Sequence, residues 1–155
     1  MTLNIISTMK TYITYIFFTL SLCFSYTLQA QEQVTWDILG QVQYKAYYNI
    51  GAGEAFQKPK FSPTIKKLDG QEVLIKGYML PLDMEGNTYV LSANPYAACF
   101  FCGGAGPESV MELWLKDTDR RYKLDQIVTF KGKLMVNSEP YGLCYILQEA
   151  DPVED

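Results

Sequence analysis

Five segments rich in β-forming residues constrain the fold of this chain more than any other feature. They lie at residues 73–82, 88–92, 110–116, 126–136 and 143–147. The two longest carry a central glycine, Gly77 and Gly132, and a glycine inside a strand marks a bend or a bulge. Such strands are typical of a small barrel of the oligonucleotide/oligosaccharide-binding (OB) type. The sequence therefore predicts a mainly β fold, a small OB-like five-stranded barrel with an N-terminal arm. Another small barrel or a sandwich is the alternative.

The limits of these segments predict the domain organisation. Residues 67–150 are expected to form the barrel, and residues 31–66 the arm, which consists of a short helix capped by Thr35 and a loop rich in glycine and proline. Residues 151–155 are expected to form a frayed acidic tail. Three tyrosines are expected to pack the arm against the barrel: Tyr44, Tyr47 and Tyr48.

Residues 1–30 have the pattern of a cleavable signal peptide. Lys10 is the only charged side chain before an uncharged apolar run from Tyr12 to Leu28, and the small Ala30 precedes a polar stretch. The prediction is export with cleavage near Ala30. Because the apolar run is close to the lower limit for crossing a bilayer, a retained N-terminal anchor is the alternative. Lipid attachment at Cys23 is not expected, since Leu22 before it is large.

The charge balance and the absence of histidine exclude several kinds of chemistry. The whole chain has 13 basic residues, 17 acidic residues and no histidine, for a net charge of −4. Removal of residues 1–30 leaves 12 basic against 17 acidic residues, a net charge of −5. An acidic surface repels phosphate backbones, so no nucleic-acid partner is expected. No imidazole can act as a metal ligand or general base, and no small-molecule substrate is identified.

One loop between two predicted strands carries the main clue to function. It contains Cys99, Phe100, Phe101, Cys102, Gly103, Gly104, Gly106, Pro107 and Glu108. This loop, the Trp36 region and the strands around Gly77 and Gly132 resemble an uncharacterised family of exported bacterial domains, some of them lipoproteins. The resemblance implies an OB-like fold and a periplasmic or membrane-surface setting. It also implies partnership with an envelope transport or membrane complex, including a role in metal uptake.

A metal site is one interpretation of this loop. Cys99 and Cys102 have the spacing of two ligands to one ion, and soft thiolates favour zinc or copper(I). Cys144 would supply the third ligand, with Asp83, Glu108 or water as the fourth. Two sulfurs are half of a structural zinc site, so this interpretation depends on Cys144.

A thiol–disulfide enzyme is a second interpretation. In such enzymes the reactive cysteine lies at a helix N-terminus, where the helix dipole lowers the thiol pKa. Here the glycine-rich run after Cys102 opposes a helix, and no lysine or arginine lies within ten residues of the pair. The sequence therefore shows no local cause for a reactive thiolate.

A third interpretation is structural. In an oxidising compartment Cys99 and Cys102 would form a disulfide, or remain a buried pair, while Cys144 stays free in its strand. Phe100 and Phe101 would plug the barrel mouth. We therefore predict an exported, non-enzymatic binding or accessory module that presents this loop. A thiol–disulfide redox protein and a structural partner-binding domain with an inert loop are the alternatives.

Overall fold

The fold of this protein is built around strands that close on themselves. The computed structural model describes residues 32–49, 51, 53–83, 88–139 and 142–153, all of which belong to the unit Gln31–Asp155. The predicted signal peptide lies outside the described residues. Export and cleavage therefore stay predictions.

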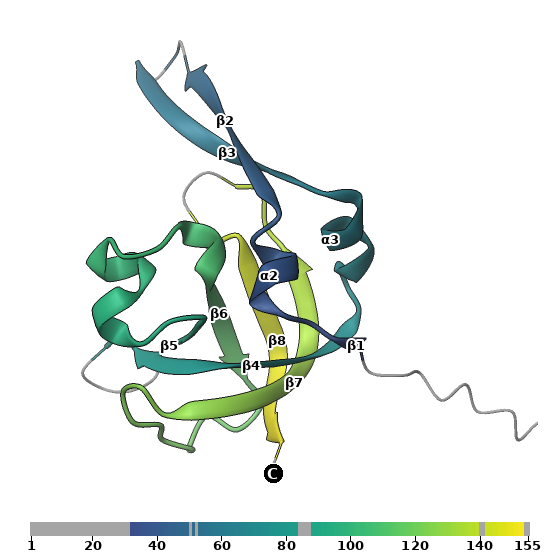
Figure 1. The fold of residues 1–155 in the computed structure, drawn as a ribbon, viewed down its shortest axis with the longest axis vertical. Helices are drawn as coiled ribbons and strands as arrows, with labels where there is room; N and C mark the ends of the chain where they lie inside the picture. Colours follow the sequence, from purple (N-terminus) through teal and green to yellow (C-terminus); the bar gives the residue numbers. More distant parts are fainter. Residues whose placement is uncertain (1–31, 50, 52, 84–87, 140–141, 154–155) are drawn as a thin grey trace, which may run out of the picture. The chain divides into compact units, whose positions relative to one another are not determined.

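Five strands form a closed barrel (Figure 1). They are β4 (Glu72–Pro81), β5 (Tyr89–Ser92), β6 (Val110–Leu115), β7 (Ile127–Val136) and β8 (Tyr145–Val153). Their order is β4-β5-β6-β8-β7, and β4 pairs with β7 to close the barrel. The pair β6–β8 is parallel, and the other barrel pairs are antiparallel. This arrangement confirms the predicted OB-like five-stranded barrel, to which β1 (Glu32–Gln33) adds an extra strand beside β4.

Strand β4 bends, and its two halves pair with different strands of the barrel. Its residues Glu72–Tyr78 pair with β7, and Tyr78–Pro81 pair with β5. A Cβ atom at Gly77 would lie 2.6 Å from the carbonyl oxygen of Ser92. The bend therefore lies where β5 approaches too closely for any side chain. Gly132 on β7 meets the same restriction against β8.

Alternating apolar side chains fill the barrel, because successive residues of a strand point to opposite faces. The largest fully buried side chains of the domain, inside the barrel or beneath the elements that cover it, are Tyr89, Tyr145, Phe130, Leu39, Ile65, Ile75, Met79, Leu80, Leu91, Met111, Leu134 and Leu147. Tyr122 joins this core from the loop between β6 and β7. Its ring lies 5.4 Å from that of Tyr89 and 5.6 Å from that of Phe130, between centroids. This connecting loop therefore contributes to the core.

The arm contains more regular structure than the predicted helix and loop. After α2 (Trp36–Leu39) come the hairpin strands β2 (Val42–Asn49) and β3 (Glu54–Phe61), then α3 (Pro63–Leu68). Pro59 suggested a loop, but each strand of a two-stranded ribbon is an edge, and an edge tolerates proline. No helix in the described part of the chain is long and apolar enough to cross a membrane.

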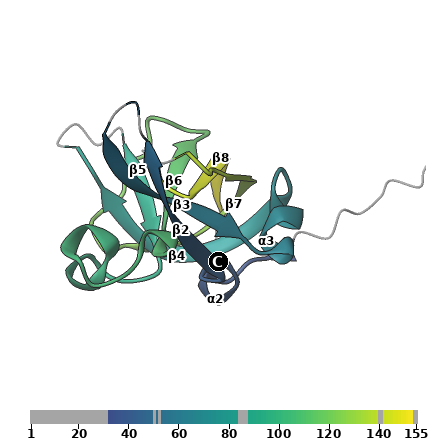
Figure 2. The ribbon, with the colours of Figure 1, turned by 90° about the horizontal axis from the view of Figure 1, so that it is seen from above.

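Hydrogen bonds from side chains on both sides help to fasten the arm to the barrel. The indole Nε1 of Trp36 donates to the carbonyl oxygen of Lys76 at 2.8 Å, and the buried hydroxyl of Tyr145 donates to the carbonyl oxygen of Leu39 at 2.6 Å. The hairpin follows α2 and lies over one end of the barrel (Figures 1 and 2). The arm is thus an integral layer of the domain.

The described C-terminal residues form a strand, in contrast to the predicted acidic tail. Asp151 to Val153 continue β8 and pair with Lys131 to Thr129 of β7. Near Gly132 the register shifts, and Glu149 takes a positive φ of 51°. This bulge lets β8 continue beyond the limit that the sequence pattern indicated.

Candidate functional site

Residues 93–109, here called the Cys-Gly loop, join β5 to β6. The loop turns in three short 3₁₀ helices, at Tyr96–Ala98, Phe100–Cys102 and Pro107–Ser109. Gly103 ends the second of them at a φ of 75°, which favours glycine. A Cβ atom at Gly104 would lie 2.7 Å from the carbonyl oxygen of Ala98. Both glycines are therefore needed for the loop to fold tightly on itself.

Cys99 holds the loop against the outside of the barrel. Its side chain is fully buried in a small apolar cluster with Leu80, Val90 and Val110. Each of these strand residues is next to a core-facing residue, so it points outward from the barrel. A role as a metal ligand is not required to explain this burial, because a free cysteine behaves as a small apolar side chain.

The prediction that Phe100 and Phe101 plug the barrel mouth is wrong. Phe100 packs on the outer cluster around Cys99, and Phe101 is 45% exposed. Their rings meet edge-on with centroids 5.4 Å apart. The loop lies on the outer face of the strands, so neither ring can reach the interior. Tyr122, from the loop between β6 and β7, is an aromatic side chain that does enter the core.

Cys102 is exposed beside Cys99, and all three cysteines of the described chain are free thiols. Desolvation and the neighbouring Cys99 thiol raise the pKa of Cys102, while a hydrogen bond with Tyr96 acts in the opposite direction. The net shift is upward, whereas a thiol-exchange enzyme needs a lowered pKa. A disulfide between Cys99 and Cys102 stays a prediction for the oxidised protein.

Cys144 belongs to a different group of side chains, which the sequence did not reveal. The Tyr44 hydroxyl donates to Oε2 of Glu108 at 3.0 Å and lies 3.3 Å from Sγ of Cys144. A carboxylate only accepts hydrogen bonds, so the single Tyr44 proton points to Glu108 and the Cys144 thiol donates to the Tyr44 oxygen. Burial, then Cys144, then Glu108 raise the pKa of Tyr44. Burial likewise raises the pKa of Cys144.

The structure does not assemble the predicted metal site. Cys144 is hydrogen-bonded to Tyr44, Glu108 accepts a hydrogen bond from the same tyrosine, and Asp83 accepts the backbone N–H of Thr88 at 2.9 Å. Within the described ranges, no three His, Cys, Asp or Glu side chains gather into a group that could hold a metal ion. The side chains present therefore do not fit a zinc or copper centre with three protein ligands.

A groove of about 670 Å³ lies between the Cys-Gly loop, the hairpin and two barrel loops. We call it the loop groove. Its lining residues are Tyr44, Gln57, Pro59, Leu82, Thr88, Val90, Phe100, Phe101, Pro107, Glu112, Glu139, Gly142, Leu143 and Cys144. The volume is in the range of small-ligand sites.

The loop groove occupies the usual ligand-binding face of an OB barrel. That face is formed by the second and third strands of the barrel and by the loops after its first and fourth strands. Here these strands are β5 and β6, which contribute Val90 and Glu112, and these loops contribute Leu82 and Leu143. The Cys-Gly loop forms a wall of this face with Phe100 and Phe101.

The lining of the loop groove is apolar and acidic. Glu112 and Glu139 are its charged members, and none of the described lining residues is lysine or arginine. Glu112 also accepts a hydrogen bond from Nε1 of Trp114 at 2.9 Å. Phe100, Phe101, Pro107 and Cys144 were site candidates from the sequence, whereas most of the other lining residues were not. These come from separate elements that no local pattern connects.

Comparison with known proteins gives one structural similarity. No protein-family model matches the chain, and no curated protein matches it. The chain is similar to a solved structure of a DUF3299 family protein from Pseudomonas aeruginosa PAO1, with 20% sequence identity and a TM-score of 0.49. The alignment covers 81% of this chain and 98% of that one. That protein comes from a domain family of unknown function, and at this similarity it assigns no activity here.

Proposed function

We propose that this protein is an exported, non-enzymatic binding module that holds a segment of a partner protein in the loop groove, as part of an envelope complex. The observation that carries the proposal is the position of the groove. It lies on the OB ligand-binding face, and Phe100 and Phe101 form one wall of it. Exposed aromatic rings at such a site provide apolar contact area at small entropic cost.

The lining indicates the chemistry of the partner segment. Leu82, Phe101 and Leu143 offer apolar contacts, while Glu112 and Glu139 add negative charge without a described basic residue among them. Charge complementarity favours partners of the opposite sign. The segment would therefore combine an apolar side chain with lysine or arginine, and an acidic segment would be repelled.

Three observations weigh against an enzymatic role at this groove. The chain has no histidine. Cys144 and Tyr44 both have raised pKa values, chiefly because they are buried, so they stay protonated near neutral pH. A nucleophilic cysteine needs its thiolate, and Cys102 shifts in the same upward direction.

Selection of peptides from a phage-displayed random library tests the proposal. We expect enriched peptides to pair an apolar residue with lysine or arginine, and Phe101→Ala to weaken binding of a selected peptide by about tenfold, since interface aromatics often dominate affinity. Titration calorimetry with the synthetic peptide measures the change. Nuclear magnetic resonance shifts on labelled protein locate the binding site.

Leu124→Ala is the matched control, because Leu124 is 51% exposed and does not line the loop groove. It should leave peptide affinity unchanged. Enrichment of acidic peptides would overturn the proposal. So would equal binding by the Phe101→Ala variant, or resonance shifts confined to another face.

A further inference from the structure

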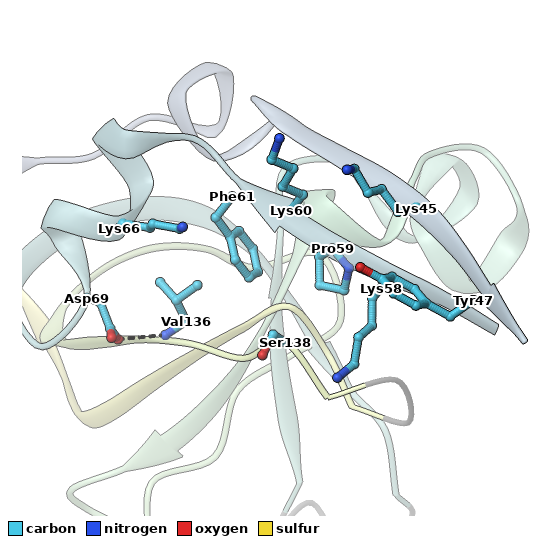
Figure 3. A pocket seen from close by; sticks show the side chains of 10 residues that line it. All are labelled: Lys45, Tyr47, Lys58, Pro59, Lys60, Phe61, Lys66, Asp69, Val136 and Ser138. Atoms are coloured by element: carbon cyan, nitrogen blue, oxygen red, sulfur yellow. Dashed lines mark hydrogen bonds between the residues drawn. The ribbon is translucent and has the colours of Figure 1, made fainter. Parts of the chain in front are cut away.

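A second concave site lies beside the hairpin, and its chemistry is opposite to that of the loop groove. This pocket, of about 630 Å³, is lined by four lysines: Lys45, Lys58, Lys60 and Lys66. Figure 3 shows them arriving from β2, β3 and α3 around Phe61. The one carboxylate in the lining, Asp69, accepts the backbone N–H of Val136 at 3.0 Å. We call this site the lysine pocket.

The hairpin register places two of these lysines side by side, where their charges repel. In the hairpin register Lys45 lies directly opposite Lys58, and Lys60 lies opposite Gln43. Cross-strand partners share one face of the ribbon, and like charges in that position repel. None of the four lysines forms an ion pair with a residue that the structure describes. An anion between them would remove the repulsion.

The pocket gathers positive charge, although the whole chain is negatively charged. The full sequence has a net charge of −4, yet this lining holds four lysines and a single carboxylate. Tyr47, whose ring stacks on Phe56 with centroids 6.0 Å apart, adds an aromatic wall. Flexible lysine side chains that line one pocket can turn toward a compact multivalent anion, whereas planar carboxylates are better matched by arginine.

The geometry points to a phosphate-binding site in the lysine pocket, for a small ligand that carries a phosphate monoester or a pyrophosphate. The pocket volume lies in the range of small-ligand sites rather than of an extended nucleic-acid track. The phosphate could belong to a soluble compound or to a lipid headgroup. The charged residues that line this pocket differ from those of the loop groove, so phosphate binding here can be tested independently of the peptide-binding proposal.

Inorganic pyrophosphate is the first probe, titrated into the full chain at low ionic strength by calorimetry and thermal unfolding. We expect binding and a raised unfolding temperature. Lys58→Gln and Lys60→Gln should each weaken binding by about tenfold, a typical loss for a charged hydrogen bond. Without pyrophosphate, both variants should unfold at the wild-type temperature or above it, since one repulsive charge is gone.

Lys116→Gln is the matched control, because it removes the same charge from an exposed lysine that pairs with Asp151. It should bind pyrophosphate like the wild type. If Lys116→Gln weakened pyrophosphate binding as much as Lys58→Gln, the attraction would be a general effect of charge, and the inference would be overturned.

Vesicles of phosphatidylglycerol, with phosphatidylcholine vesicles as the neutral control, form the second arm of the experiment. Binding to phosphatidylglycerol alone, lost in Lys58→Gln, would identify a lipid as the source of the phosphate. Binding of neither probe would overturn the site.

Discussion

Tyr44 on the hairpin donates its hydroxyl hydrogen to Glu108 of the Cys-Gly loop at 3.0 Å, across 64 residues of sequence. The bond joins two walls of the loop groove, because β2 contributes Tyr44 and the loop contributes Phe100 and Phe101. The Cys144 thiol, 3.3 Å from the same hydroxyl, extends the contact to the segment before β8. The shape of the groove therefore depends on one tyrosine.

Replacement of Tyr44 by phenylalanine tests this dependence. We expect Tyr44→Phe to lower the free energy of unfolding by about 1–2 kcal/mol, because it leaves the partners of the hydroxyl without their hydrogen bonds. Urea denaturation measures the loss. Tyr48→Phe is the control, since Tyr48 is 65% exposed, and it should have the wild-type stability. Equal stabilities for the two variants would contradict this role of Tyr44.

Stability should fall at alkaline pH. Burial raises the pKa of Cys144 above its ordinary 9.0 and the pKa values of Tyr44 and Tyr145 above their ordinary 10.0. Above about pH 9 the unfolded chain releases these protons while the folded chain retains them, so rising pH favours unfolding. The stabilisation is complete below that pH and declines above it.

Urea denaturation between about pH 7 and 10 checks this prediction. Cys144→Ala removes one of the three groups, so its unfolding free energy should decline less steeply with pH than that of the wild type. Tyr48→Phe is the comparison, because Tyr48 is 65% exposed and lies outside this group. A slope unchanged by Cys144→Ala would contradict the assignment.

The two cysteines of the Cys-Gly loop should respond differently to substitution in the reduced protein. Cys99→Ser places a hydroxyl in the apolar cluster with Leu80 and Val90, and we expect a loss of about 1–2 kcal/mol. Cys102→Ser, at an exposed position, should leave stability close to the wild type. In native protein a thiol reagent should label Cys102 rapidly and the two buried cysteines slowly. Two rapidly labelled thiols would show that Cys99 is not held under the loop.

Gly77 should tolerate no side chain. Gly77→Ala would place Cβ 2.6 Å from the carbonyl oxygen of Ser92, and the shift of backbone should cost about 2–3 kcal/mol. Gly53→Ala is the matched control, because it has open space and a φ of 69°, so only the backbone strain of about 1 kcal/mol applies. Thermal unfolding compares them. A smaller loss for Gly77→Ala would contradict the close approach of β5.

If the protein is exported and its signal peptide removed near Ala30, the native protein begins close to Gln31. Mass spectrometry of protein recovered from cells should find Gln31, or a residue within a few positions, at the amino end. Intact Met1 on envelope-associated protein would replace cleavage by a retained anchor. A mature protein recovered from the cytoplasm would remove the basis for an envelope setting.

Local pattern alone located the barrel strands. Alternation of apolar and polar residues is a property of neighbouring positions, so β4, β6 and β7 lie within a residue or so of the predicted segments. The bends at Gly77 and Gly132 were equally readable, since a glycine inside a strand has few other uses. The hairpin was missed because Pro59 lies in β3, and edge position cannot be known before pairing.

Only the tertiary structure decided which side chains meet. Tyr44 reaches Glu108 and Cys144 across 64 and 100 residues because barrel closure brings the hairpin, the Cys-Gly loop and β8 together, and no local pattern encodes that closure. The same holds for charge. The net charge of −5 without residues 1–30 argued against a nucleic-acid partner, yet the hairpin register and α3 gather four lysines in one pocket. A net charge sums over the chain, whereas an electrostatic field depends on distance.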